Sequence, residues 1–263
     1  MKYIVDNDLH IHSQISLCSS DPEQTNERIL QYAKDNSLKN ICLTDHFWDE
    51  NVPGASDWYA LQNYPHISAA KPLPQADGIK FMFGCETELD KNMTLGISKE
   101  KFDKFDFIII PTTHFHMVGF TISPEIQTPE QKAEFWLKKF NAVLDMDLPF
   151  HKVGMAHLVC GLMDQSRENV LKIVGLLSDT DLQKVFKRAA DKGVGIELNA
   201  DDMKFKDEEK SVILRPFEIA KKEGCKFYLG SDAHHPKNLN EAKAVFERAV
   251  NLLDLTEEDK FTL

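Results

Sequence analysis

Short apolar runs alternate along the chain with longer amphipathic stretches. Seven runs rich in β-branched and aromatic residues end in polar side chains, and stretches with helical spacing of apolar positions follow them. This order is typical of β/α units around a parallel sheet and predicts an α/β fold. Because no Gly/Ser/Pro-rich linker divides the chain, we expect residues 1–263 to form a single domain. The expected strands begin at Tyr3, Asn40, Lys80, Phe105, Lys152, Gly193 and Lys226.

Two of the connecting stretches open with a helix-start signal. Asp21-Pro22 and Thr128-Pro129 each place a capping residue before a proline, with glutamine at the third helical position. Near the end of the chain, apolar residues between Ala242 and Leu253 recur with helical spacing. This last stretch predicts a helix with one buried face.

Composition and charge narrow the classes of function. The longest apolar run, at Phe107–Ile110, is far shorter than a membrane span, and the amino terminus lacks the layout of a signal peptide. Five widely spaced cysteines fit reduced thiols, so we expect a cytoplasmic protein that does not bind membranes. A net charge of −11 argues against nucleic-acid polymers as partners. A small anionic substrate would need cations held at the site.

Candidate chemistry lies where the apolar runs stop. In six of the seven segments a histidine or carboxylate stands at that point. The carboxyl ends of barrel strands carry catalytic residues because the βα loops converge there. Residues i and i+2 of a strand share a face, which allows His10 and His12 to bind the same or neighbouring ions. The candidate metal ligands are His10, His12, His46, Glu86, His114, His157, Asp232 and His234.

Six segments resemble motifs of the polymerase-and-histidinol-phosphatase (PHP) superfamily of metal-dependent phosphoesterases. They run in order from residue 8 to residue 236 and read "DLHIHS", "LTDH", "GCETEL", "PTTHFH", "MAHL" and "LGSDAHHP". The resemblance implies a distorted (β/α)7 TIM-like barrel with two to three divalent metals. By matching position, a first ion would use His10, His12, Glu86 and Asp232, a second Glu86, His114 and His157, and a third His46 and His234.

The implied reaction is hydrolysis of a small phosphate monoester by a metal-bridged hydroxide. Imidazole and carboxylate ligands suit zinc, manganese or iron, which neutralise phosphate oxygens and activate water. Glu86 has two oxygens and so can bridge two ions, and we expect Glu86, Asp232 and His234 to act in catalysis. The ending "RPFEIAKKEGCKFYLGSDAHHP" resembles histidinol-phosphate phosphatases, which makes histidinol phosphate the leading substrate.

Two other functions stay open at this stage. A nucleotide phosphodiesterase or nuclease of the same superfamily would use the same metals on a diester. A non-catalytic, regulatory metal-binding barrel would keep the ligands for stability. Metal analysis and phosphate release separate these alternatives from a phosphatase. The sequence does not define the oligomeric state.

Several neighbouring residues have two possible roles. Cys18 or Asp21 could complete the third ion, and Asp45 could orient His46 or act on the leaving group. His116 is either a substrate contact or an ordinary surface or core histidine. Two further sets could contact substrate or be structural, namely Glu197 with Asn199, and Lys204 with Lys206 and Arg215.

The segment between Phe47 and Gly78 is too long for a usual βα turn. It contains several aromatic residues and prolines. It is interpreted either as a lid that shapes the leaving-group pocket or as a structural excursion anchored by aromatic side chains.

Overall fold

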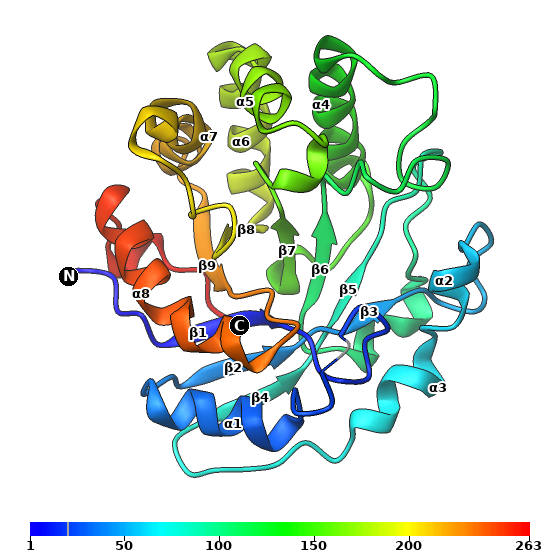
Figure 1. Cartoon of the computed structure of the whole chain (residues 1–263), viewed down its shortest axis with the longest axis vertical. Helices are drawn as coiled ribbons and strands as arrows, with labels where there is room; N and C mark the ends of the chain where they lie inside the picture. The colour runs from blue at the N-terminus through cyan, green and yellow to red at the C-terminus, as the bar shows by residue number, and fades with distance from the viewer. Residues whose placement is uncertain (20) are drawn as a thin grey trace.

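Strands and helices alternate in the computed structural model, which describes residues 1–19 and 21–263 (Figure 1). The strands are β1 Asn7–Ile11, β2 Asn40–Leu43, β3 His46–Phe47, β4 Lys80–Phe83, β5 Cys85–Thr87, β6 Ile108–Pro111, β7 Val153–Ala156, β8 Gly195–Asn199 and β9 Lys226–Gly230. The α-helices are α1 Asn26–Asp35, α2 Asp57–Ala60, α3 Tyr64–Ile67, α4 Pro129–Asp145, α5 Arg167–Leu176, α6 Asp179–Lys192, α7 Lys210–Lys222 and α8 Pro236–Leu252.

Every strand pair in the two sheets is parallel. One sheet has the strand order β1-β2-β4 and the other β3-β5-β6-β7-β8-β9. The second and third expected strands are each broken in two, so seven runs give nine strand segments. The end of β9 returns to β1, because the Asp232 N–H donates to the His10 carbonyl at 2.7 Å and the His12 N–H donates to the Ala233 carbonyl at 3.1 Å.

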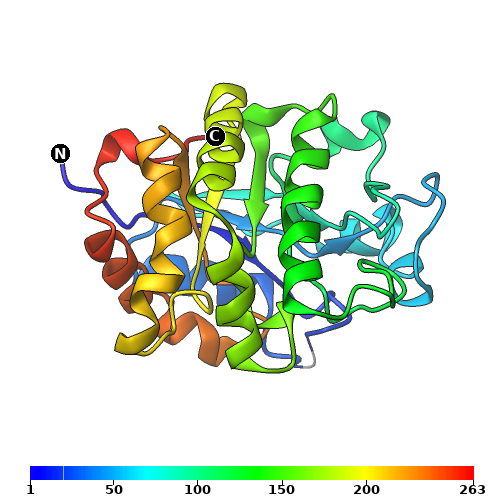
Figure 2. The ribbon, with the colours of Figure 1, turned by 90° about the horizontal axis from the view of Figure 1, so that it is seen from above.

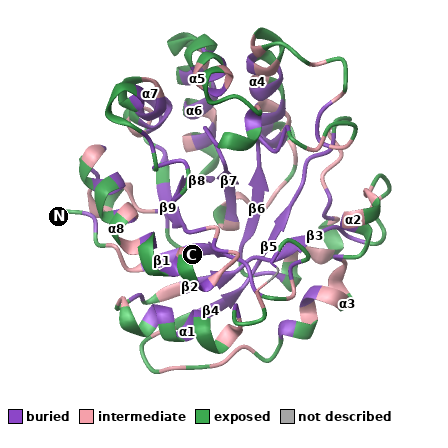
Figure 3. Cartoon of the chain, in the orientation of Figure 1, coloured by how far each residue is buried: buried purple, intermediate pink, exposed green. Residues whose placement is uncertain are grey.

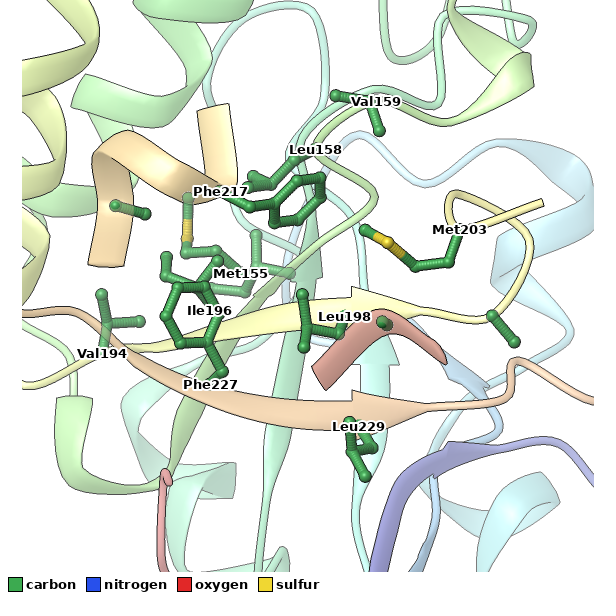
Figure 4. Close-up of a cluster of buried hydrophobic side chains, with 14 of the residues drawn as sticks. Met155, Leu158, Val159, Val194, Ile196, Leu198, Met203, Phe217, Phe227 and Leu229 are labelled. Carbon is green, nitrogen blue, oxygen red and sulfur yellow. The ribbon is translucent and has the colours of Figure 1, made fainter. Parts of the chain in front are cut away.

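Two layers of apolar side chains hold these strands. An inner cluster fills the space that the strands surround, and a larger outer core packs the strands against the helices. Figure 4 shows part of the outer core, where Ile196 of β8 and Phe227 of β9 lie with Phe217 of α7. The inner cluster consists of Leu9, Cys42, Met82, Phe107, Ile109, Ala156, Tyr228 and Phe261.

Helices form the outer layer of the molecule. Helices α4, α5, α6 and α7 lie side by side (Figure 2), and the helices carry much of the exposed ribbon whereas the strands are mostly buried (Figure 3). Together with the parallel order and the filled interior, this arrangement is a distorted, TIM-like β/α barrel. The fold class that the resemblance implied is confirmed.

The two helix-start signals had different outcomes. Helix α4 begins after Thr128 with the expected capping box to Gln131. The prediction at Asp21 is wrong, because the Asp21 carboxylate accepts the Glu23 N–H at 2.8 Å in a tight turn, and α1 begins after the capping residue Thr25. Within the described ranges, no helix is long and apolar enough to cross a membrane.

Candidate metal centre

Inward-facing positions change from apolar to polar along three of the expected strands. In each of them a residue of the inner cluster is followed four positions later by a histidine or carboxylate at the mouth of the barrel. Side chains of one strand alternate between faces, so positions i and i+4 point to the same side. The clearest pairs are Cys42 with His46, Met82 with Glu86, and Tyr228 with Asp232. The lower part of the barrel is thus a packed core and the upper part carries the ionisable groups.

All eight predicted ligands meet at this mouth. Their donor atoms fall into groups in which every atom lies within 4.8 Å of the others. The first group corresponds to the expected first ion and the second to the expected second ion. Three of the five groups hold the eight predicted ligands: His10, His12, Glu86 and Asp232; Glu86, His114 and His157; and His12, Cys18, His46 and His234.

The first group has the spacing of ligands around one small cation. The Nε2 atoms of His10 and His12 are 3.1 Å apart, and each lies 3.2 to 3.4 Å from a Glu86 oxygen and an Asp232 oxygen. Four ligands at about 2.1 Å from a tetrahedral zinc ion are separated by about 3.4 Å. Two imidazole nitrogens and two carboxylate oxygens at these distances therefore fit a single divalent ion.

Glu86 lies between the groups. Its Oε2 atom is 3.0 Å from His46 Nδ1, whereas Oε1 is 3.4 Å from His157 Nε2 and 4.0 Å from His114 Nε2. Both oxygens are buried and have no hydrogen-bond partner in the part of the chain that the structure describes, and the same holds for His157 Nε2 and Asp232 Oδ1. A buried acceptor without a hydrogen-bond partner costs folding free energy, and a bound cation would remove that cost, so this set of donor atoms fits bound cations.

The third group includes Cys18 rather than Asp21. The Cys18 thiol lies in the group with His12, His46 and His234. Asp21 instead pairs with His235, with 2.6 Å between Oδ2 and Nε2. Burial raises the pKa of Cys18, but contacts with His234 and His46 outweigh it and lower the pKa to about 5. A thiolate at this position is a soft ligand suited to zinc.

The buried charges of the site compensate one another. Burial lowers the pKa of His10, but Glu197, Asp232 and Glu86 outweigh it and raise the pKa to about 10. Burial raises the pKa of Glu86, but His46 and His10 hold it well below its usual range. The carboxylates are therefore ionised at neutral pH and attract positive charge to the mouth.

Two carboxylates accept hydrogen bonds from candidate ligand histidines on the side of the ring that faces away from the donor groups. The His10 Nδ1–H donates to Glu197 at 2.6 Å, and the His114 Nδ1–H donates to Glu88 at 2.5 Å. A carboxylate accepts only, so in both rings the Nδ1 proton is held in place, and Nε2, which faces the group of donors, is the nitrogen free to give up its proton to a cation. Glu88 also accepts the Tyr59 hydroxyl at 3.0 Å. The sequence analysis missed Glu88, although its position two residues after Glu86 places both on one face.

A buried lysine lies near Glu88. Lys139 of α4 is fully buried, and its ammonium has no hydrogen-bond partner among the described residues. Burial lowers the pKa of Lys139 to about 8, and the negative charges of Glu88 and Asp90 oppose this shift. It was not singled out from the sequence, because one lysine in an amphipathic helix is normally exposed.

Other candidates lie apart from the mouth or have a structural role. Asp45 accepts both the N–H and the hydroxyl of Ser13, at 2.7 and 2.8 Å, and so orients that turn. Glu197 and Asn199 are buried beneath the ligands. Arg215 donates to Asp179 at 2.7 Å. Lys204 and Lys206, like Arg215, are not among the residues that line the cavity beside the ligands.

A cavity of about 470 Å³ opens beside the second and third groups. His46, His114 and His234 lie in its wall, as does the exposed His116. The long segment after β3 contributes Trp58. This segment is also anchored by buried Trp48 and Tyr59. It therefore contributes to the wall of the cavity and is held in place by aromatic side chains.

Parallel strands with a gathered set of imidazoles and carboxylates at their carboxyl ends define a β/α barrel of the kind that holds several metal ions. The sequence model of the PHP domain matches residues 8–201, and the chain belongs to this family. Asp232 and His234 lie beyond the matched residues. No curated protein matches the chain by sequence.

Solved structures share the architecture at low sequence identity. A histidinol phosphate phosphatase from Lactococcus lactis, complexed with zinc, L-histidinol and phosphate, is 19% identical, with 93% of each chain covered and a TM-score of 0.59. A probable 2-pyrone-4,6-dicarboxylic acid hydrolase from Acinetobacter baumannii with citric acid bound is 13% identical, with 97% of each chain covered and a TM-score of 0.42. The first of these supports the barrel fold.

Proposed function

We propose that this protein is a metal-dependent phosphoesterase that hydrolyses a small phosphate monoester. The observation that carries the proposal is the position of Glu86, whose two buried oxygens face different sets of histidines. Family membership supports the same reaction class. Histidinol phosphate is the first named monoester to test, because the similar barrel from Lactococcus lactis was solved with L-histidinol and phosphate.

Each group of donors has a role in this proposal. His10, His12, Glu86 and Asp232 would hold a first ion, and Glu86 with His114 and His157 a second. Cys18, His46 and His234 would hold a third. When bound, such cations neutralise phosphate oxygens and supply a water that loses its proton near neutral pH.

The chain's own residues prepare this site. Glu197 and Glu88 hold the Nδ1 protons of His10 and His114, so that Nε2 of each ring is the nitrogen that would bind a cation. His234 Nδ1 donates to the Asp232 carbonyl at 2.8 Å, which leaves its Nε2 as an acceptor. His234 also lines the cavity, so its ring stands beside the position of a leaving group.

Asp232 provides a sharp test. It has a left-handed backbone with φ +52°, a conformation that asparagine also adopts readily. Asp232→Asn should therefore keep the fold while it removes one charged ligand. We expect protein purified without chelator to contain at least two transition-metal ions per chain and to release phosphate from monoesters, and the variant to lose turnover.

Asp254→Asn is the matched control, since Asp254 also has a left-handed backbone with φ +48° but lies outside the three groups. It should keep full activity. Wild-type protein with metal but no phosphate release from any monoester would refute the phosphatase and favour a non-catalytic barrel. Release from diesters only would favour the phosphodiesterase.

A further inference from the structure

The cavity beside the ligands has an apolar wall opposite them. Trp58 packs edge-on against His46, with 5.2 Å between ring centroids, and so stands directly beside a proposed ligand. The remaining apolar wall comes from two other segments of the chain. It consists of Met117, Val118, Phe120 and Leu162. A phosphate held at the ligands would direct the rest of the ester toward these side chains.

Two of these apolar side chains are unusually exposed. Val118 is 64% exposed and Leu162 is 42% exposed, and both lie at this cavity. Exposed apolar side chains gathered at one concave site mark a place where an apolar group binds. The cavity volume of about 470 Å³ is large enough for a leaving group with a ring or a branched chain.

Charged partners for a leaving group are missing from the wall. Among the described residues that line the cavity there is no lysine or arginine, and the two carboxylates are Glu86 and Asp232. Both belong to the groups of metal donors. A cationic leaving group would thus lack a free carboxylate, and an anionic one would lack a cation other than the proposed metals.

The neighbouring cavity does not supply these charges. It has a volume of about 860 Å³ and shares His116, Val118 and Leu162 with the first cavity. Its two charged side chains, Lys132 and Asp164, pair with each other at 2.6 Å and are largely buried. Neither is free to pair with an ester that reaches beyond Val118.

We infer that the preferred substrate is a monoester of an uncharged, apolar alcohol, a class to which histidinol phosphate, with its ammonium group, does not belong. This inference rests on the proposed phosphoesterase function. Water adds to phosphorus, the bond between phosphorus and the ester oxygen breaks, and the oxygen leaves as the alcohol with a proton from that water. The products are the neutral alcohol and inorganic phosphate.

An isosteric pair of substrates tests the inference directly. 3,3-Dimethylbutyl phosphate and phosphocholine have the same shape, but only phosphocholine carries a cationic leaving group. Choline is the better leaving group chemically, so a preference for the neutral ester has to come from the pocket. We expect kcat/KM to favour the neutral ester about tenfold or more, because the cation loses water without gaining a carboxylate.

A charge placed at the rim should change this preference. Val118 is exposed enough to accept a polar side chain. Val118→Asp should shift the kcat/KM ratio toward phosphocholine about two- to fivefold, the size of an exposed ion pair. Val118→Asn is the matched control, because asparagine has the shape of aspartate and no charge. Its kcat/KM ratio of the two esters should equal that of the wild type or lie between those of the wild type and Val118→Asp.

An aromatic side chain can itself bind a cation, and Trp58 is the residue that would do so. Trp58→Leu removes the aromatic face and keeps an apolar wall, so we expect the ratio of the two esters to stay within about twofold. Equal or better hydrolysis of phosphocholine by the wild type, lost selectively in Trp58→Leu, would overturn the inference. Hydrolysis of histidinol phosphate well above 3,3-dimethylbutyl phosphate would overturn it too.

The failure of the inference is distinct from failure of the proposed function. Phenyl phosphate, which has a good and uncharged leaving group, is included as a third substrate. No phosphate release from any of the three esters or from histidinol phosphate would refute the phosphatase itself. Release with a preference for the charged esters would refute only the apolar leaving-group pocket.

Discussion

Replacement of Glu197 by glutamine should weaken the first proposed metal ion without removing a ligand. The Glu197 carboxylate accepts three hydrogen bonds: one oxygen accepts the His10 Nδ1–H at 2.6 Å, and the other accepts the His157 N–H at 3.0 Å and the Asn199 amide at 3.3 Å. A glutamine of the same shape has one oxygen and one NH₂ group. If the oxygen stays on the His157 N–H, the NH₂ faces His10 Nδ1, and that atom must become an acceptor. The His10 proton then moves to Nε2, the atom that faces Glu86 and Asp232.

The magnitude follows from this change of tautomer. A protonated Nε2 does not bind a cation, so binding requires His10 to return to the original tautomer with its Nδ1–H against the amide. Loss of such a hydrogen-bond partner behind a metal-bound histidine typically costs about 10- to 100-fold in metal affinity. That corresponds to about 1.4 to 2.7 kcal/mol of binding free energy.

Competition with a chromophoric chelator measures this affinity. Glu209→Gln is the matched control, because Glu209 is also largely buried and accepts three hydrogen bonds, two from Arg167 at 3.1 and 2.7 Å and one from the Lys206 N–H at 3.2 Å. Burial of the carboxylate is thus comparable, but Glu209 belongs to none of the donor groups. We expect the control to lose stability and to keep metal affinity. Unchanged affinity in Glu197→Gln, with the fold intact by circular dichroism, would refute the tautomer argument.

Three further predictions concern packing, charge and the third ion. Gly230→Ala should weaken metal binding and cost about 1 to 3 kcal/mol of unfolding free energy, because the added Cβ would lie 2.2 Å from Glu197 Oε1. The control is Gly175→Ala in a helix, where the Cβ would meet open space, and a urea titration should show no loss of stability. In the wild type, the unfolding free energy should rise between pH 8 and about 10.5, because the folded protein has lost the Lys139 proton there and the unfolded chain still binds it. Lys139→Met should remove this rise, which is at most about 3 kcal/mol. Parallel curves of unfolding free energy against pH for wild type and variant would contradict the prediction. Cys18→Ser should lower the number of bound metal ions by up to one while Asp21→Asn leaves it unchanged, and elemental analysis that shows the opposite would return the third site to Asp21.

Strand positions and the gathering of the candidate ligands at one mouth could be predicted because both follow from local alternation. Each apolar run stops where the next βα loop begins, at the mouth of the barrel, and the parallel order of the strands brings these ends together. The His46 and Glu86 positions are direct neighbours in the β3–β5 pair. Their functional roles stay predictions, as do the single domain and the cytoplasmic location.

Loops and long-range pairing were harder to predict. Whether Cys18 or Asp21 approaches the histidines depends on a turn whose path no short-range rule fixes, and the Asp21 carboxylate formed that turn instead of a helix cap. Asp45 was expected near His46 by sequence proximity, but its partner Ser13 lies on another strand end. Glu197 was recognised as facing inward, whereas its contact with His10 joins strands that lie far apart in sequence.

The junction of β9 with β1 has a consequence for how the protein acquires its ions during synthesis. His10 and His12 leave the ribosome first, and Asp232 follows more than 200 residues later. The backbone bond from Asp232 to His10 and the first group of donors therefore form only after the last strand has docked, a contact of long sequence separation. A nascent chain without β9 lacks Asp232 and His234, so the first and third groups of donors stay incomplete until the barrel is nearly whole. A circular permutant that places β9 directly before β1 would bring these ligands together early in synthesis.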